Sequence, residues 1–117
     1  MSASEDCLFC KIAVGQIPAE KIHEDALLFA IKDINPAAPT HLLIISQEHI
    51  ATIADLEEQH TTLVGKVYLL ARRIAEEQGF AEDGYRVVSN CRRDGGQTVS
   101  HIHFHLLAGR GLGWPPG

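Results

Sequence analysis

The stretch HIHFHLL, residues 101–107, decides the fold of this chain. Histidines alternate with apolar residues along it, and successive side chains of a β-strand point to opposite faces of a sheet. We therefore expect a strand over His101 to Ala108, with Ile102, Phe104 and Leu106 packed into an apolar core. The opposite face of this strand would present the three histidines in one row.

The row of His101, His103 and His105 contributes little to packing, because each buried ring needs a hydrogen-bond partner and like charges repel. One interpretation is a polar face that is histidine by chance. A second is a metal site, since alternating imidazoles can share a zinc ion. The third, which we favour, is catalysis in which a neutral imidazole attacks phosphorus while a neighbour supplies a proton. Imidazole titrates near neutrality, so adjacent rings can differ in protonation.

The segment just before the histidines, Asp94 to Thr98 with the sequence DGGQT, offers backbone N–H groups at two glycines together with amide and hydroxyl side chains. Such donors suit a phosphate group. The double glycine alone would also fit a hairpin turn. The segment therefore supports phosphate chemistry only in combination with the histidines.

The rest of the chain predicts an α+β fold, in which mostly antiparallel strands carry helices. Apolar residues at 63, 67, 70 and 74 recur at helical spacing and Gly79 can end a helix, so one long amphipathic helix is expected over Leu56 to Gln78. Short apolar runs between turn residues predict strands. The other expected elements are a short helix at 7–14 ended by Gly15, a hairpin of strands at 21–23 and 27–32, a strand at 41–46, a strand at 85–89 antiparallel to 101–108, and a turn at 92–96.

The size and charge of the chain limit its function. With 117 residues, 45% of them hydrophobic, it has room for one domain over residues 1–117, with an irregular tail at 109–117. A net charge of −5 argues against binding of long nucleic acids, which takes clustered lysine and arginine. No apolar run is long enough to span a membrane, and Met1 to Asp6 lacks the pattern of a signal peptide, so we expect a cytoplasmic protein.

The pattern of three alternating histidines resembles the signature of the histidine triad superfamily of nucleotide hydrolases and transferases. Further matches extend the resemblance to its nucleotide-binding branch and cover nearly the whole chain. They lie at residues 7–12, 15–18, 33–36, 38–41, 84–86, 90, 95–97 and 114–117.

The resemblance implies a fold with about five strands and a homodimer that hydrolyses purine nucleoside phosphoramidates. Adenosine 5′-phosphoramidate is the expected type of substrate, aminoacyl adenylates are a further one, and no catalytic metal is required. Three alternatives stay open, of which the first two are a hydrolase of dinucleoside polyphosphates and a nucleotide-binding or interaction module with little catalysis. A metal-dependent hydrolase is a third.

The resemblance also implies roles for individual residues. His103 would be the nucleophile, oriented by a backbone carbonyl through its other ring nitrogen, and His105 would contact the phosphate. His41 and His101 would complete the imidazole cluster, and Asp33 would accept hydrogen bonds from the ribose. Further nucleotide contacts are expected from Asn90, Gly96, Gln97 and Thr98 at the phosphate, from Asn35, and from a base pocket of Phe9, Ile12, Ile31, Ile34 and Leu43.

Simpler explanations exist for some of these residues when the resemblance is set aside. Asp33 precedes a proline-containing loop and could be a turn residue. Asn90 could close a turn in the same way. The aliphatic residues would be core by default, although lining a pocket does not exclude packing in the core.

Cys7 and Cys10 are spaced C-x-x-C, and with three cysteines in the chain a disulfide framework is not expected. Two thiolates are half of a tetrahedral zinc site, and two reduced cysteines buried on a short helix are the alternative. Some bacterial members of the superfamily bind a structural zinc with this pair and with histidines that match His49 and His101. The resemblance therefore implies a structural zinc here, with His101 facing the metal rather than the substrate. Cys91 is interpreted as a simple thiol.

Overall fold

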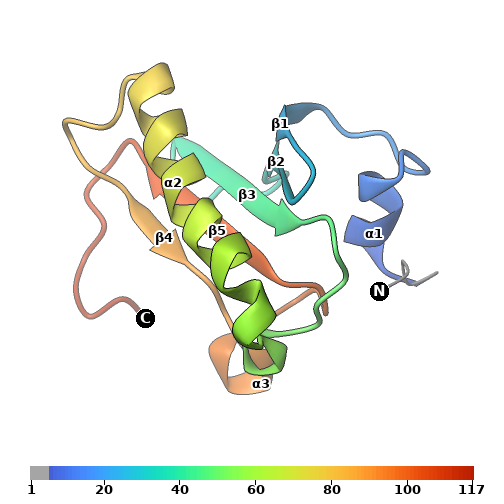
Figure 1. Cartoon of the computed structure of the whole chain (residues 1–117). Helices are drawn as coiled ribbons and strands as arrows, with labels where there is room; N and C mark the ends of the chain where they lie inside the picture. Colours follow the sequence, from blue (N-terminus) through green and yellow to red (C-terminus); the bar gives the residue numbers. More distant parts are fainter. Residues whose placement is uncertain (1–5) are drawn as a thin grey trace.

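Five strands form one antiparallel sheet, and a long helix packs across it (Figure 1). The structure is a computed structural model that describes residues 6–117. The strands are β1 (Lys21–Glu24), β2 (Leu28–Lys32), β3 (Thr40–Ser46), β4 (Arg86–Val88) and β5 (His103–Ala108), in the spatial order β1-β2-β3-β5-β4. The helices are α1 (Leu8–Ala13), α2 (Thr61–Gln78) and α3 (Arg92–Gly95), with 3-10 turns η1 (Ile53–Asp55) and η2 (Glu58–His60). The expected α+β fold is confirmed.

Strands β2 and β3 are buried on both faces of the sheet, which explains why residues 28–31 and 42–45 are apolar without interruption. Leu28 and Ala30 of β2 belong to one apolar cluster, and Phe29 and Ile31 between them belong to another. Successive side chains of a strand point to opposite sides, so the two clusters lie on opposite faces. One face carries α2 and the other carries α1.

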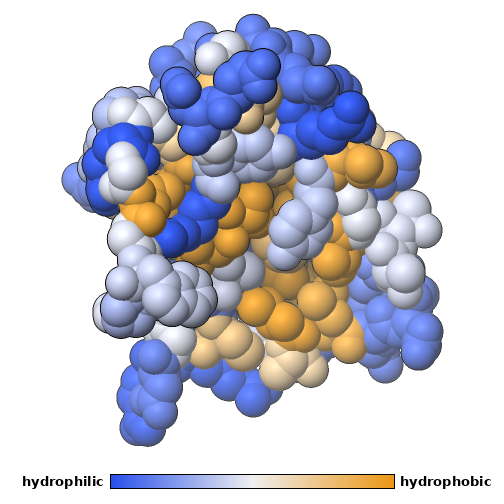
Figure 2. All heavy atoms as spheres, turned by 90° about the vertical axis from the view of Figure 1, so that its left-hand side faces the viewer, coloured by the Kyte–Doolittle hydropathy of each residue, from blue (hydrophilic) through white to orange (hydrophobic). Residues whose placement is uncertain are grey.

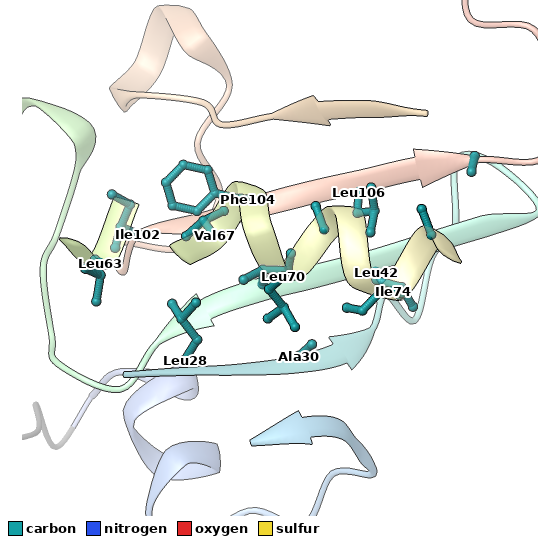
Figure 3. Close-up of a cluster of buried hydrophobic side chains, with 14 of the residues drawn as sticks. Leu28, Ala30, Leu42, Leu63, Val67, Leu70, Ile74, Ile102, Phe104 and Leu106 are labelled. Carbon is teal, nitrogen blue, oxygen red and sulfur yellow. The ribbon is translucent and has the colours of Figure 1, made fainter. Parts of the chain in front are cut away.

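The α2 face holds the larger core (Figure 3). One side of α2 is apolar at a spacing of three or four residues and lies over β2, β3 and β5, as the expected amphipathic pattern requires. Full burial of one such side chain stabilises the fold by about 1.5–3 kcal/mol. The labelled residues of this core are Leu63, Val67, Leu70 and Ile74 of α2, Leu28, Ala30 and Leu42 of β2 and β3, and Ile102, Phe104 and Leu106 in and before β5.

The α1 face is smaller and more polar. Phe9, Cys10 and Ile12 of α1 are buried against Phe29 and Ile45 of the sheet. Helix α1 covers only part of this face, and the histidines of β5 lie beside it. The fold therefore keeps one face for packing and leaves the other for a site.

Three expected boundaries are wrong. Strand β5 begins at His103 and not at His101, because the N–H of Ile102 donates to Ile50 in a loop, at 2.7 Å, and not to a neighbouring strand. Helix α2 begins at Thr61 rather than Leu56, since η2 precedes it. Residues 92–95, expected as a turn, form the short helix α3. The other expected elements are present within two residues of their expected ends.

The surface carries hydrophobic residues on the side of the C-terminal tail and of the loop after α2. Figure 2 shows this side, on which hydrophobic residues gather in one area bordered by hydrophilic ones. No helix within residues 6–117 is long and apolar enough to cross a lipid bilayer. Residues 109–117 contain no helix or strand. Residues 1–5, most of the start that lacks a signal-peptide pattern, lie outside the described residues.

Two glycines of α2 allow a matched test of the backbone. Gly79 ends the helix at φ 85°, where an L-residue is strained, so Gly79→Ala should lower the free energy of unfolding by about 1 kcal/mol. Gly65 lies inside the helix, where a Cβ would meet nothing within 4 Å, so Gly65→Ala should raise it by about 0.5–1 kcal/mol. Urea unfolding measures both changes, and effects of the same sign would contradict this account.

Candidate active site

The histidines of β5 point to the α1 face because of the strand register. His103 lies opposite Ile45 and His105 opposite Leu43 in the antiparallel pair of β3 and β5. Residues directly opposite each other in such a pair share one face. Leu43 and Ile45 belong to the α1-face cluster, so both imidazoles lie on that side.

A pocket of about 520 Å³ opens on this face, between α1, the sheet and the segment before β5. Its walls are mainly apolar, with His103, His105, Asp33 and Thr98 among the polar residues. A largely apolar pocket with a few convergent polar groups is typical of a small-molecule site. Of the expected base-pocket residues, Phe9, Ile12, Ile31, Ile34 and Leu43 all line it.

His103 is held in one tautomer by the backbone. Its Nδ1–H donates to the carbonyl oxygen of His101 at 2.7 Å, so the proton of the neutral ring is on Nδ1. Nε2 then carries the lone pair. The ring is buried, lies edge-on to Phe9 at 5.1 Å between ring centroids, and lines the pocket. This is the tautomer that an Nε2 nucleophile needs.

His41 and His105 form a second hydrogen-bonded unit. The N–H of Ala37 donates to Nδ1 of His41 at 2.9 Å, which leaves the proton of a neutral His41 on Nε2. That Nε2 lies 2.9 Å from Nδ1 of His105 and 3.3 Å from Oδ2 of Asp33. Donation from His41 to His105 places the proton of a neutral His105 on its own Nε2. Burial, followed by the nearby His103 and His41, lowers the pKa of His105, although Asp33 opposes this shift.

Asp33 directly follows strand β2 in the chain. Its Oδ1 accepts the N–H of Asn35 at 2.8 Å, and Oδ2 faces His41. Asp33 and Ile34 line the pocket, whereas Asn35 does not. The Ile34 side chain is 92% exposed, which is unusual for a large aliphatic residue and fits a pocket wall that a ligand would cover.

The segment before β5 is held mainly by Gln97. Its side-chain NH₂ donates to the carbonyls of Ala51 and Val99, and its side-chain oxygen accepts the N–H of Arg92. Thr98 lines the pocket, but Asn90, Gly96 and Gln97 do not. The phosphate contacts expected of these last three residues stay a prediction.

A separate group of thiols and imidazoles lies next to the pocket. The side chains of Cys7, Cys10, His49 and His101 bring one donor atom each to within 4.8 Å of one another, and we call this group the Cys–His cluster. Nδ1 of His101 lies 3.2 Å from Sγ of Cys7, 3.5 Å from Sγ of Cys10 and 3.2 Å from Nδ1 of His49. Donor atoms of a tetrahedral zinc site are separated by about 3.3–3.8 Å. No disulfide joins the described cysteines.

The tautomer of His101 also fits a metal ligand. Its Nε2 donates to the carbonyl of Ser46 at 2.7 Å, so Nδ1 presents its lone pair to the cluster. A ligating histidine typically donates its other N–H to a carbonyl in this way. The ring is 0% exposed, and burial lowers the pKa of His101 to about 4, which keeps it neutral. The donor set and its geometry therefore fit zinc.

The expected row of three histidines is divided in the structure. His103 and His105 line the pocket with their ring centroids 5.2 Å apart. His101, expected both as part of the catalytic group and as a zinc ligand, is absent from the pocket wall and lies in the Cys–His cluster. Its backbone carbonyl, rather than its ring, contacts His103.

Sequence reasoning missed part of the pocket wall and one partner of the cluster. Ser46, which accepts the His101 proton through its carbonyl, carries no signal beyond being the polar end of an apolar strand. The match at residues 15–18 pointed to Ile17 and Pro18 without giving them a role. The missed wall residues are Leu8, Ile17, Pro18, Ala19, Glu20, Lys32 and Val99.

Comparisons with known proteins identify relatives along nearly the whole chain. Residues 14–112 match the family model described as HIT domain. The purine nucleoside phosphoramidase of Escherichia coli K12 is 46% identical over 110 residues, which cover 94% of this chain and 92% of that protein. The 14 kDa zinc-binding protein of Zea mays is 45% identical over 112 residues, covering 94% and 87%. The crystal structure of a HIT family hydrolase from Legionella pneumophila Philadelphia 1 has a TM-score of 0.93 and 51% identity, covering 96% of this chain and all of that one.

The buried His101 predicts a pH dependence of stability. Its pKa is about 4 in the folded protein and about 6.5 in the unfolded chain. The unfolded chain therefore binds the extra proton first, and stability that is complete above pH 6.5 is lost as the pH falls towards 4. The loss should total about 3 kcal/mol in chelator-treated protein, with His105 adding in the same direction.

Urea unfolding between pH 7.5 and 4.5 measures this effect. The carboxylates with lowered pKa values, Glu24 and Asp25, begin to contribute only near the lower end of that range, so the change between pH 7.5 and about 5.5 reports the histidines. A folded His101→Gln variant should show a smaller slope. Constant stability from pH 7.5 to 4.5 in the unsubstituted protein would contradict the neutral, buried state of His101.

Proposed function

Because this chain belongs to the HIT domain family, we propose that it hydrolyses purine nucleoside 5′-phosphoramidates through a covalent histidine intermediate. The observation that carries the proposal is the hydrogen bond from Nδ1–H of His103 to the carbonyl of His101. It leaves the Nε2 lone pair of a pocket-lining imidazole available to attack. The purine nucleoside phosphoramidase of Escherichia coli supports the choice of substrate class.

In the proposed reaction, the Nε2 lone pair of His103 attacks the α-phosphorus and the bond from phosphorus to the leaving nitrogen breaks. The nitrogen leaves as an amine after taking up one proton, and the nucleotidyl group stays on His103. Water then attacks the same phosphorus, the bond to Nε2 breaks, and one proton is released. Overall, one water is consumed for each nucleoside monophosphate and amine formed.

The neighbouring groups have distinct proposed roles. His105, whose Nε2 carries a proton in the tautomer described above, donates to a phosphoryl oxygen, and His41 keeps His105 in that tautomer. The carboxylate of Asp33 accepts hydrogen bonds from the ribose hydroxyls, and the hydroxyl of Thr98 contacts the phosphate. The base lies against the apolar wall formed by Phe9, Ile12, Ile31, Ile34 and Leu43.

A structural zinc ion is part of the proposal. The Cys–His cluster would hold it with two thiolates and two neutral imidazoles, which is a closed tetrahedral set with no position left for substrate. Such an ion stabilises folding and does not take part in the chemistry. The 14 kDa zinc-binding protein of Zea mays, which is 45% identical to this chain over 112 residues, supports this part of the proposal.

We also propose that the protein acts as a cytoplasmic homodimer. Strand β4 is at the edge of the sheet, where one side of its backbone has no partner strand within the described residues. Large hydrophobic side chains are exposed near it and on α2, among them Tyr68, Leu69 and Tyr85. Light scattering after size-exclusion chromatography would report twice the mass of one chain.

The nucleophile is tested by His103→Ala. This variant should lose at least about a thousandfold in kcat/KM for adenosine 5′-phosphoramidate, because no other pocket-lining nitrogen has a lone pair directed by the backbone in this way. It should still bind AMP. Mass spectrometry of the quenched wild-type reaction should find one adenylyl group on the peptide that contains His103.

His23→Ala is the matched control, since His23 lies on β1 outside the pocket, and it should keep full turnover. Undiminished hydrolysis by His103→Ala would remove the proposed mechanism. Tight purine nucleotide binding by wild type without turnover would favour a binding module. Faster cleavage of dinucleoside polyphosphates than of phosphoramidates would show that dinucleoside polyphosphates are the preferred substrates.

Zinc is tested by metal analysis. The purified protein should contain about one zinc per chain, and Cys10→Ser should lose it and unfold at a lower temperature. Cys91→Ser, which lies outside the cluster, should keep both zinc and stability. Equal zinc contents in the two variants would rule out the proposed ligand set.

A further inference from the structure

We propose that the Cys–His cluster positions the active site, so that its metal occupancy sets both the orientation of His103 and the affinity for the nucleotide. This inference rests on the function proposed above and gives the cluster a role in catalysis beyond stability. Cys7, Cys10, His49 and His101 then act as positioning residues, because none of their donor atoms touches the substrate.

The first connection runs through one peptide unit. The carbonyl of His101 accepts Nδ1–H of His103 at 2.7 Å, and the N–H of Ile102 in the same peptide plane donates to Ile50 at 2.7 Å. The hydrogen bond between Ile102 and Ile50 joins two segments of the chain. In each segment the preceding residue, His101 or His49, belongs to the Cys–His cluster. A peptide unit is planar, so its carbonyl cannot turn without moving its N–H. The cluster therefore holds both segments whose positions fix the His101 carbonyl, which orients His103.

The second connection runs through α1. Cys7 caps the N-terminus of this helix, with its Sγ accepting the N–H of Cys10 at 3.3 Å, and Cys10 itself lies one turn into the helix. Phe9 lies between the two cysteines and is edge-on to the rings of His101 and His103, at 5.8 Å and 5.1 Å between centroids. Phe9 and Ile12 are also pocket wall. An α1 helix of only six residues depends on such anchors, because isolated short helices are unstable in water.

The third observation is a hollow that reaches the cluster without crossing the pocket. A separate hollow of about 430 Å³ is lined by Cys7 and His49 of the cluster. Leu8, Thr98 and Val99 line both this hollow and the active-site pocket, so the two adjoin each other. The cluster therefore borders a hollow other than the pocket in which the nucleotide is proposed to bind.

Loss of the metal should disturb both connections. Without a cation, Nδ1 of His101 and Nδ1 of His49 face each other at 3.2 Å beside two sulfur atoms. One proton between these nitrogens makes a single hydrogen bond, which holds the cluster less firmly than four ligands bound to one cation, so without the metal the side chains can move apart. That movement would turn the carbonyl away from His103 and release α1 from the pocket wall. The expected result is a lower kcat together with a higher KM.

The test compares cluster variants with matched controls of the same chemistry. Cys10→Ser and His49→Asn remove one ligand each, and Cys91→Ser and His23→Asn are the same changes outside the cluster. Each protein is assayed for kcat and KM with adenosine 5′-phosphoramidate, and for the Kd of AMP by calorimetry. Nitrogen-15 NMR of the histidine rings reports whether the proton of His103 remains on Nδ1.

Cluster variants should show a Kd for AMP raised about tenfold, a kcat lowered about tenfold, and a mixture of His103 tautomers. The controls should match wild type within twofold. Where a cluster variant does not fold by circular dichroism, chelated wild type below its unfolding temperature takes its place, and zinc added back should restore all three values.

Three results would overturn the inference: wild type that binds no zinc, folded metal-free protein whose kcat, KM and Kd stay within twofold, or an unchanged His103 tautomer in that protein. Failure of the proposed function is distinguishable from these results. If wild type hydrolyses no phosphoramidate, the Kd for AMP and the NMR measurement still decide whether the cluster positions the pocket.

Discussion

The hydrogen bond from Nδ1–H of His103 to the carbonyl of His101 is the interaction on which the site depends. It fixes which nitrogen of a buried, pocket-lining imidazole carries the proton, and so which nitrogen keeps the lone pair. The acceptor is a backbone atom in the segment just before β5, so its position depends on the contacts that this segment makes with the rest of the protein. These contacts include the bond from Ile102 to Ile50 and the ring of His101 in the Cys–His cluster.

The two faces of the sheet divide stability from chemistry. On the α2 face, apolar side chains from β2, β3 and β5 pack against one stripe of a long helix, and this core needs no polar group. On the α1 face, the same strands present imidazoles and aliphatic pocket walls that a six-residue helix only partly covers. Because alternate residues of one strand serve the two faces, the pocket rests on a rigid support without interrupting the core.

Burial of imidazoles is costly unless each ring nitrogen finds a partner, and the protein meets this requirement with backbone groups. Carbonyls of Ser46 and His101 accept from His101 and His103, and the N–H of Ala37 donates to His41. Each bond also selects a tautomer, so the same contacts that satisfy the buried rings prepare them for metal binding or for attack. Among the described residues, no buried side-chain nitrogen or oxygen lacks a hydrogen-bond partner.

The sequence by itself determined the fold class, the helix α2, the pairing of β1 with β2 and of β4 with β5, and the face on which His103 and His105 lie, because turn residues and side-chain periodicities of 2.0 or 3.6 residues are local properties. Tertiary structure decided that His101 leaves the histidine row and joins the cysteines, that β5 begins two residues later than expected, that β3 lies between β2 and β5, and that Gln97 joins its segment to Ala51. Those outcomes depend on partners far away in the chain: Cys7 lies 94 residues from His101, Ser46 lies 55, and His41 lies 64 residues from His105. A periodic pattern predicts which face of the sheet a histidine lies on. The hydrogen-bond or metal partners of its ring nitrogens are determined only when segments distant in the sequence pack together.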